Sequence, residues 1–180
     1  MPATPMTHRP ADERIRDVYR ETIGPLYAYV SRRCAGERAL AEDVVQETWL
    51  RAVNAWRLKG LPDTPAAWLT TVAHNLLVNH YRRRPMVPLS DIPSEAILAV
   101  VDNGFDTKST DVARLIQWGL ARLPRSQAGL LEAFHLEQRS VAAIALELRV
   151  SERAVEGRLR RARRKLRQLI ERVTHTKGER

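Results

Sequence analysis

Apolar residues recur every three or four positions along most of this chain, and the alternation typical of strands is nearly absent. Because this period matches one face of an α-helix, the pattern predicts an all-α protein. We expect helices over about 12–34, 37–58, 65–84, 111–122, 125–136, 140–148 and 151–173. Gly24 and Pro25 predict a kink or a restart inside the first of these, and Thr64 and Asp111 are the expected N-caps of the third and fourth.

The stretch 85–110 breaks the helical pattern with three prolines, a glycine and several Ser, Thr and Asp residues. A segment of this length without structure is unusual inside one compact domain. It therefore predicts a flexible linker between two small helical domains, 12–84 and 111–173. We expect disordered ends at 1–11 and 174–180.

The segment "AEDVVQETWLRAV", residues 41–53, has an unusual polar side. At 100° per residue, one narrow arc is apolar and should be buried. Its members are Ala41, Val45, Trp49, Ala52 and Trp56. Leu50 points away from this arc, beside Asp43, Gln46 and Glu47. An isolated exposed leucine is normal on protein surfaces, but this grouping also fits a docking patch for another protein.

Charge and composition narrow the class of partner. Lys and Arg number 30 against 21 Asp and Glu, which gives a formal net charge of +9 and favours a polyanionic partner. The one cysteine, Cys34, permits no internal disulfide and belongs to no zinc-binding pattern. No apolar run approaches the roughly 20 residues of a membrane span, and the first residues lack the apolar core of a signal peptide. We expect a soluble cytoplasmic protein without a cofactor, a metal or membrane insertion.

The last two predicted helices have the proportions of a helix-turn-helix. The shorter helix should turn four apolar residues inward, namely Val141, Ile144, Ala145 and Leu148. A tight turn at Arg149 and Val150 follows, and Ser151 is placed as the N-cap of the longer helix. The inward stripe of that longer helix is Val155, Leu159, Ala162, Leu166 and Leu169.

The opposite side of the last helix is strongly cationic. It carries Arg153, Gly157, Arg160, Arg161 and Arg164. Residues 151–172 contain nine basic side chains against three acidic ones, whereas a merely solvated helix usually mixes its charges. This favours DNA binding in the major groove, with glycine allowing close approach. Glu156 at the edge is compatible with selection of cytosine, with repulsion of phosphate, or with an ion pair to Arg153 or Arg160.

The third predicted helix also has two different sides. The apolar side carries Trp68, Leu69, Val72, Ala73 and Leu76. The polar side carries Thr71, His74, Asn75 and Arg82, with Asn79 near the boundary. Amides, hydroxyls and the final arginines suit bases and phosphates, although "RRR" at 82–84 is equally typical of a charged helix end.

Three segments in this order carry a family resemblance: "AEDVVQETWLRAV", "AWLTTVAHNLLVNHYRRR" and "SVAAIALELRVSERAVEGRLRRARRKLR". Together they resemble a bacterial RNA polymerase sigma factor of the sigma-seventy family, in the extracytoplasmic-function (ECF) group. The first helical block resembles region 2 and the second resembles region 4, with no region 3 domain between them.

The resemblance implies a role for each surface. Residues expected to bind core RNA polymerase are Asp43, Val44, Gln46, Glu47 and Leu50. Residues expected at the minus-ten element are Lys59, Gly60, Asp63, Thr64, Thr71, His74, Asn75, Asn79, Arg82 and Arg83. Residues expected at the minus-thirty-five element are Ser151, Arg153, Glu156, Gly157, Arg160, Arg161 and Arg164.

The implied partners are core RNA polymerase, double-stranded and melted promoter DNA, and an anti-sigma factor, and we expect a monomer when the protein is free. No covalent chemistry is expected. The sequence departs from common family residues at His74, Asn79, Glu156 and Gly157, which leaves the promoter sequence open. The rival interpretation is a stand-alone helix-turn-helix regulator, which would leave the polar side of 41–53 unexplained.

Overall fold

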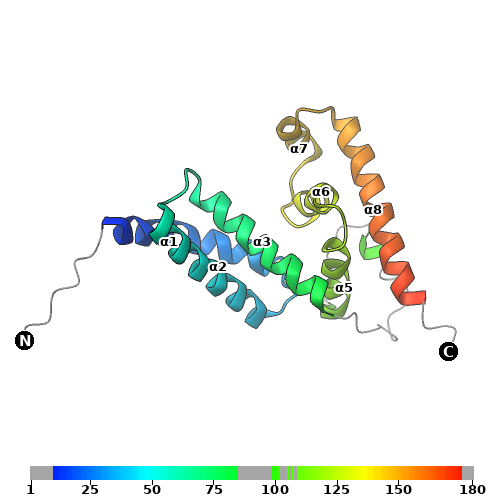
Figure 1. The fold of residues 1–180 in the computed structure, drawn as a ribbon. Helices are drawn as coiled ribbons and strands as arrows, with labels where there is room; N and C mark the ends of the chain where they lie inside the picture. Colours follow the sequence, from blue (N-terminus) through cyan, green and yellow to red (C-terminus); the bar gives the residue numbers. More distant parts are fainter. Residues whose placement is uncertain (1–9, 85–98, 102–104, 106, 108, 176–180) are drawn as a thin grey trace, which may run out of the picture. The chain divides into compact units, whose positions relative to one another are not determined.

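The computed structural model describes residues 10–84, 99–101, 105, 107 and 109–175. These residues form α-helices and no β-strand (Figure 1), which confirms the all-α prediction. They divide into two compact units, of which the first ends at Leu77 and the second begins at Val78. The predicted boundary at 84, the linker 85–110 and the disordered ends 1–11 and 174–180 stay predictions, because 1–9, 85–98 and 176–180 lie outside the described residues.

Two helices, α1 (Pro10–Ser31) and α2 (Arg38–Lys59), pack together in the first unit, and α3 (Pro65–Arg83) follows them. A kink or a restart was predicted at Gly24 and Pro25, and the restart is wrong, since α1 continues through both residues. Gly24 and Pro25 face solvent. Proline has no N–H to donate to the carbonyl one turn earlier, and at an exposed position water can donate to that carbonyl instead. Leu26 and Val30, just after the proline, are buried, so packing favours continuing the helix.

The core of the first unit is built around aromatic rings. The five apolar residues predicted to line the inner side of α2 are all buried, which confirms that arc. Trp49 contacts Tyr19 edge to face at 4.9 Å between ring centroids, and it contacts Trp56 at 5.7 Å. Trp56 in turn meets Trp68 of α3 at 5.4 Å. This chain of rings links all three helices and fixes which side of α2 remains outside.

The second unit contains α5 (Thr110–Leu120), α6 (Arg125–His135), α7 (Val141–Leu148) and α8 (Glu152–His175). The N-cap of α5 is Ser109, whose hydroxyl accepts from the Val112 amide, so the prediction of Asp111 is wrong. Asp111 lies in the first turn, where a carboxylate favours the helix dipole. The helix begins earlier because serine is as good an N-cap as aspartate.

Part of the predicted linker packs in the core of the second unit. Val101 is fully buried and Phe105 is 8% exposed, and both belong to the same apolar cluster as α5, α6 and α8. The Phe105 amide donates to the Val100 carbonyl. The second unit therefore includes residues that precede Asp111, because the short apolar run near 100 finds a partner only after the chain has folded.

Candidate docking surface and nucleic-acid interface

The exposed side of α2 carries the residues predicted to bind a protein. Leu50 is 55% exposed, although Trp49 beside it is buried. Asp43 and Gln46 are exposed, and Glu47 is half-buried. We call Asp43, Gln46, Glu47 and Leu50 the docking patch. Its four members lie on one helix, so their spacing does not depend on any loop.

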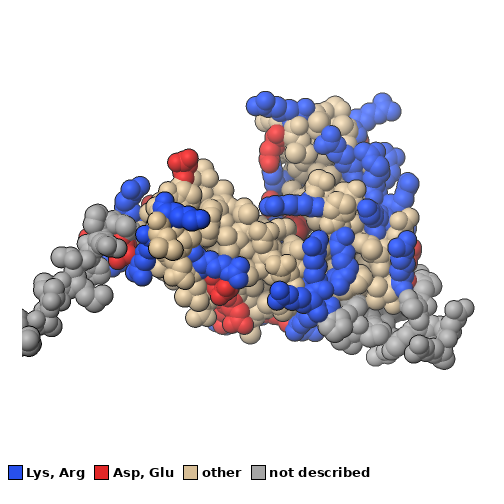
Figure 2. All heavy atoms as spheres, viewed as in Figure 1, with Lys and Arg blue, Asp and Glu red and all other residues tan. Residues whose placement is uncertain are grey.

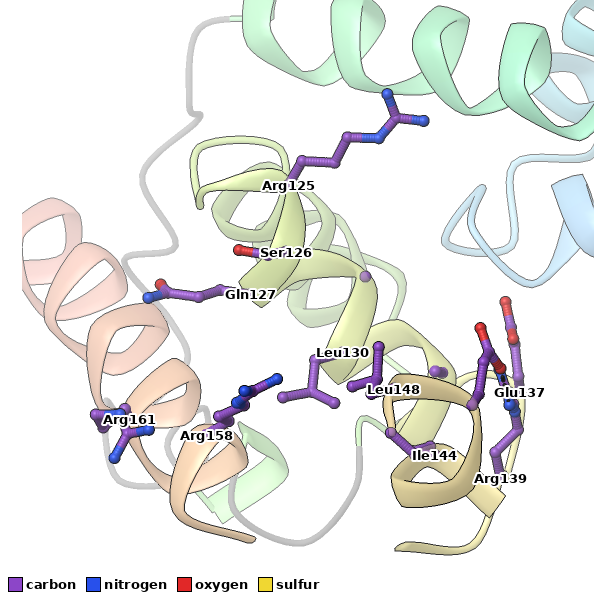
Figure 3. Close-up of a pocket in the computed structure, with 13 residues that line it drawn as sticks. Arg125, Ser126, Gln127, Leu130, Glu137, Arg139, Ile144, Leu148, Arg158 and Arg161 are labelled. Carbon is purple, nitrogen blue, oxygen red and sulfur yellow. Dashed lines mark hydrogen bonds and ion pairs between the residues drawn. The ribbon is translucent and has the colours of Figure 1, made fainter. Parts of the chain in front are cut away.

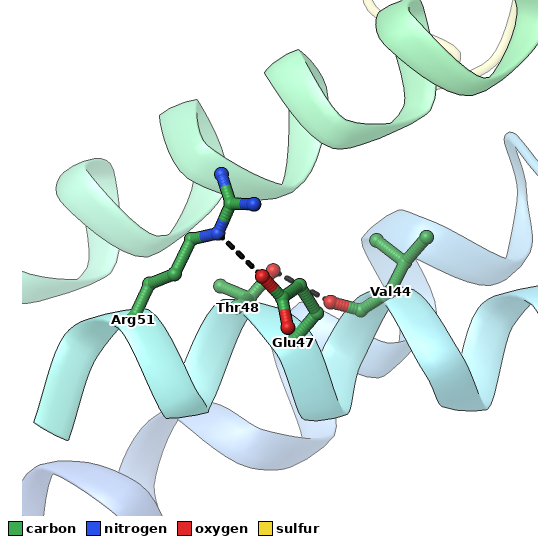
Figure 4. Close-up of polar contacts among 4 residues, drawn as sticks. All are labelled: Val44, Glu47, Thr48 and Arg51. Atoms are coloured by element: carbon green, nitrogen blue, oxygen red, sulfur yellow. Dashed lines mark hydrogen bonds and ion pairs between the residues drawn. The ribbon is translucent and has the colours of Figure 1, made fainter. Parts of the chain in front are cut away.

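Val44 does not belong to this exposed surface. Its side chain is 6% exposed and packs in the core, so it cannot be a direct docking contact on this face. The reason is that the buried arc of α2 is wider than the narrow stripe expected, and it also takes in Thr48. The Thr48 hydroxyl donates to the Val44 carbonyl at 2.7 Å (Figure 4), which satisfies this buried polar group within the helix.

An ion pair orders the acidic part of the docking patch. Arg51 lies one turn after Glu47 on α2, and its Nε donates to Glu47 Oε1 at 2.7 Å (Figure 4). Both side chains are partly solvated, so the pair adds little to stability. It places a positive charge next to the Glu47 carboxylate. The prediction omitted Arg51, although the Glu47 and Arg51 spacing of four residues was readable from the sequence.

The loop after α2 begins at a glycine with positive φ. Gly60 has φ 81°, and its amide donates to the Trp56 carbonyl at the end of the helix. Pro65 is the first residue of α3, as predicted. Leu58, in the last turn of α2, is 85% exposed and was not among the predicted site residues. Lys59 is the last residue of α2, and Gly60, Asp63 and Thr64 lie in the short connection between α2 and α3.

A polar arc runs along α3. Its members are Thr71, His74, Asn75, Asn79, Arg82 and Arg83. All are exposed except His74, which is half-buried, with the Tyr29 hydroxyl 3.4 Å from its Nδ1. The Arg33 guanidinium lies 3.7 Å from the centre of the Tyr29 ring. Tyr29 and Arg33 were not predicted, because no local pattern connects α1 to a residue 45 positions later.

The opposite side of α3 is buried at Leu69 and Ala73 and half-buried at Trp68, Val72 and Leu76, which agrees with the predicted apolar side. Leu77 and Tyr81 are also buried and extend that side towards the end of the helix. The polar arc is therefore presented outward by a helix that is anchored along its whole length.

The predicted helix-turn-helix is formed by α7 and α8. Ser140 and Ser151 cap the two helices, with hydroxyls that accept from the amides of Ala143 and Ala154 at 3.1 and 3.2 Å. Arg149 makes the turn between them in a left-handed conformation, with φ 53°. Positive φ is uncommon for a residue other than glycine, and here it allows the chain to reverse within two residues.

Leu148 is a correction to the predicted inward side of α7. It is 44% exposed, whereas Ile144 and Ala145 are buried. The helix has only eight residues, and Leu148 is its last, so no following turn covers it. Leu146 is even more exposed, at 82%.

The two sides of α8 are as predicted. Val155, Leu159, Ala162 and Leu166 are buried, and Leu169 is half-buried. The exposed members of the opposite side are Arg153, Glu156, Arg160, Arg161 and Arg164, with Gly157 half-buried among them. We call these six residues the recognition face. Figure 2 shows Lys and Arg side chains gathered over the second unit, with few acidic ones among them.

A groove of about 570 Å³ lies between α6, α7 and α8 (Figure 3). Its cationic residues include Arg158 and Arg161 from α8 and Arg125 from α6. Leu130, Ile144 and Leu148 provide apolar surface in it. Arg139 and Glu147 form an ion pair at its edge. Arg161 therefore borders both this groove and the recognition face, and Arg158 and Arg125 were not among the predicted site residues.

Neither a metal site nor a membrane span is found in the described part of the chain. It contains no group of three or more His, Cys, Asp or Glu residues that could hold a metal ion. It also contains no helix both long and apolar enough to span a bilayer. Cys34 is buried, and this burial, with the negative charge of Glu37, raises the pKa of its thiol to about 12. A thiol in this state packs as an apolar group rather than reacting.

Comparisons with known proteins agree with the two-unit arrangement. The family model described as sigma-70 region 2 matches residues 18–85, and that described as sigma-70 region 4 matches 114–166. The ECF RNA polymerase sigma factor SigL of Mycobacterium tuberculosis is 32% identical over 170 residues, which cover 91% of this chain and 92% of that protein. SigF of Caulobacter vibrioides, also an ECF sigma factor, is 31% identical and covers 85% of this chain and 82% of its own length.

These matches run through both helical units and through the docking patch, the polar arc and the recognition face. The chain belongs to the sigma-70 family of RNA polymerase sigma factors, in its ECF group. Sigma factors are transcription initiation factors rather than enzymes.

Proposed function

We propose that three surfaces divide the work of transcription initiation. The protein is a sigma factor that binds core RNA polymerase and directs it to promoters. In this proposal the docking patch of α2 binds the polymerase. The loop at 59–64 and the polar arc of α3 hold melted minus-ten DNA, and the recognition face of α8 reads the minus-thirty-five duplex.

The observation that carries the docking role is the exposure of Leu50 on a helix whose other side is fully packed. An exposed leucine gains free energy only when a partner covers it, about 25 cal/mol for each Å² of apolar surface removed from water. The surrounding carboxylates and amide select a partner that offers donors or cations. Val44 contributes by packing α2 against its neighbours rather than by contact.

The positive charge of the recognition face and its place on the second helix of a helix-turn-helix support DNA binding. The recognition face contains four arginines and one glutamate, on a helix preceded by a capped turn. Arginine can bind guanine edges with two hydrogen bonds or hold phosphates. The polar arc offers amides and hydroxyls, which suit bases that have left the duplex.

Three further properties belong to the proposal. We place the protein in the cytoplasm, where core polymerase and DNA are found. We expect it to be a monomer when free, and we expect an anti-sigma factor that covers one or both units. The stand-alone regulator is not favoured, because it gives no role to the docking patch.

The experiment that tests the proposal is reconstitution. The purified protein is mixed with sigma-free core polymerase, co-elution is measured, and transcripts started on fragmented genomic DNA are sequenced. Specific starts that share two upstream elements are the expected result. DNA binding without co-elution would contradict the proposal and favour the stand-alone regulator.

A further inference from the structure

Arg163 and Arg164 are neighbours on α8 with opposite placements. Arg164 is exposed on the recognition face, whereas Arg163 is half-buried on the side that faces the core. Both belong to the nine basic residues that the sequence places between 151 and 172. The two side chains are equivalent in a count of charges, but they differ in their surroundings.

Arg163 is held by the end of α6. Its Nε donates to Nε2 of His135 at 3.2 Å, and its guanidinium lies 5.4 Å from the centre of the Phe134 ring. The donor is a cation and the acceptor is buried, at 6% exposure, so the bond is stronger than a neutral one at the surface. The ring of Phe134 adds a cation–π attraction.

His135 is itself fixed by packing. Its ring lies 4.4 Å from that of Phe105 and 4.9 Å from that of Phe134, in a tilted and an edge-to-face arrangement. Because Nε2 accepts a bond, the ring must be neutral with its proton on Nδ1. Burial and the positive charge of Arg163 lower the pKa of His135 to about 4, which keeps this acceptor available at neutral pH.

We propose that His135 is a positioning residue for promoter recognition. Its neutral ring accepts a hydrogen bond from Arg163 and so adds a polar anchor to the apolar packing that fixes the rotation of α8 about its own axis. Arg163 then makes no DNA contact, and Arg160 and Arg164 face outward. The inference rests on the proposed role of the recognition face.

Two variants that each remove one positive charge, Arg163→Gln and Arg164→Gln, form a matched pair. Each is assembled with core polymerase, and promoter binding is measured from low to moderate salt. A phosphate contact contributes about 0.9 to the slope of log affinity against log salt. We expect Arg164→Gln to lower that slope by this amount and Arg163→Gln to leave it unchanged.

Arg163→Gln should instead weaken the preference for the correct minus-thirty-five sequence, roughly tenfold, because the helix loses its anchor. An equal fall of the slope in both variants would overturn the inference while leaving the recognition face in its proposed role. Unchanged slopes and unchanged sequence preference in both variants would overturn the role of the recognition face and the inference with it.

Variants at His135 separate positioning from bulk. His135→Gln keeps an oxygen that can accept from Arg163, and His135→Leu fills the space without an acceptor. We expect the glutamine variant to retain sequence preference and the leucine variant to lose it. Circular dichroism should show that both variants are folded. Nitrogen NMR of the wild-type ring should show the tautomer with its proton on Nδ1. A proton on Nε2, or preference retained in the leucine variant, would overturn the proposal.

Discussion

Trp49 and Leu50 are adjacent in the chain and lie on opposite sides of α2. Trp49 is 7% exposed and packs between Tyr19 and Trp56, whereas Leu50 is 55% exposed. The packing of one residue determines the exposure of the other, because the helix cannot rotate without removing Trp49 from its ring partners. The docking patch is thus a consequence of the aromatic core.

Substitution of Leu50 tests this patch. We expect Leu50→Asp to abolish co-elution with core polymerase, because a charge replaces the apolar contact at the interface. The free energy of unfolding, measured by urea denaturation, should change by less than about 0.5 kcal/mol, since the site is exposed. The control is Leu58→Asp, the same substitution at another exposed leucine of α2. Loss of co-elution in both variants would argue against a specific patch.

Arg160 is expected to contact a base. Arg160→Ala should weaken binding of the holoenzyme to the preferred minus-thirty-five duplex by about 1–3 kcal/mol and relax the sequence requirement at one position. Binding to a panel of duplexes with single base changes provides the measurement. A uniform loss over the whole panel would identify Arg160 as a phosphate contact instead.

Gly157 has room for a side chain, whereas Gly119 does not. A Cβ at Gly157 would meet only the Arg161 guanidinium at 3.6 Å, while a Cβ at Gly119 would lie 2.5 Å from Leu166 Cδ1 in the core. Gly157→Ala should therefore raise the free energy of unfolding by about 0.8–1 kcal/mol through helix propensity. Gly119→Val should lower it by about 1–3 kcal/mol through overpacking.

Both changes can be measured by urea unfolding of the full chain. If Gly157 allows close approach to DNA, Gly157→Ala should also weaken promoter binding in spite of its greater stability. Unchanged promoter affinity would show that the major groove of the DNA tolerates a methyl group at position 157.

Acidification should destabilise the protein through His135. Its pKa is lowered from an ordinary 6.5 to about 4 in the folded state, so the unfolded chain binds this proton more readily. The contribution of neutral His135 to the free energy of unfolding is therefore fully present above pH 6.5. It is lost as the pH falls towards 4, by about 3 kcal/mol in total. The difference in unfolding free energy between wild type and His135→Gln, followed from pH 7.5 to 4.5, measures it. A pH-independent difference would contradict the assignment.

Limited proteolysis tests where the second unit begins. Val101 and Phe105 pack in its core, so the resistant C-terminal fragment should start before Val101. Mass spectrometry of the fragment identifies its first residue. A fragment that starts at or beyond Asp111 would support the longer linker predicted from composition.

The periodicity of apolar residues was enough to predict the helices, the buried arc of α2 and the stripe of α8. Those features are local, since residues three and four apart share a side of a helix whatever it packs against. The same pattern located the recognition face and the exposed Leu50. The cap at Ser109 was missed because Ser109 and Asp111 are both good N-caps, and the choice between them depends on where the helix meets the core.

The sequence by itself determined which residues each helix offers and the family to which they belong. Only the tertiary structure decided which of those residues remain available. Val44 is buried because the arc packed around Trp49 and Trp56 is wider than one stripe, and Leu148 is exposed because α7 ends there. Arg163 is half-buried on the core side of α8, where it donates a hydrogen bond to His135, 28 residues earlier in the chain. Contacts between residues so far apart leave no periodic trace in the chain, because they form only when separate helices are brought together.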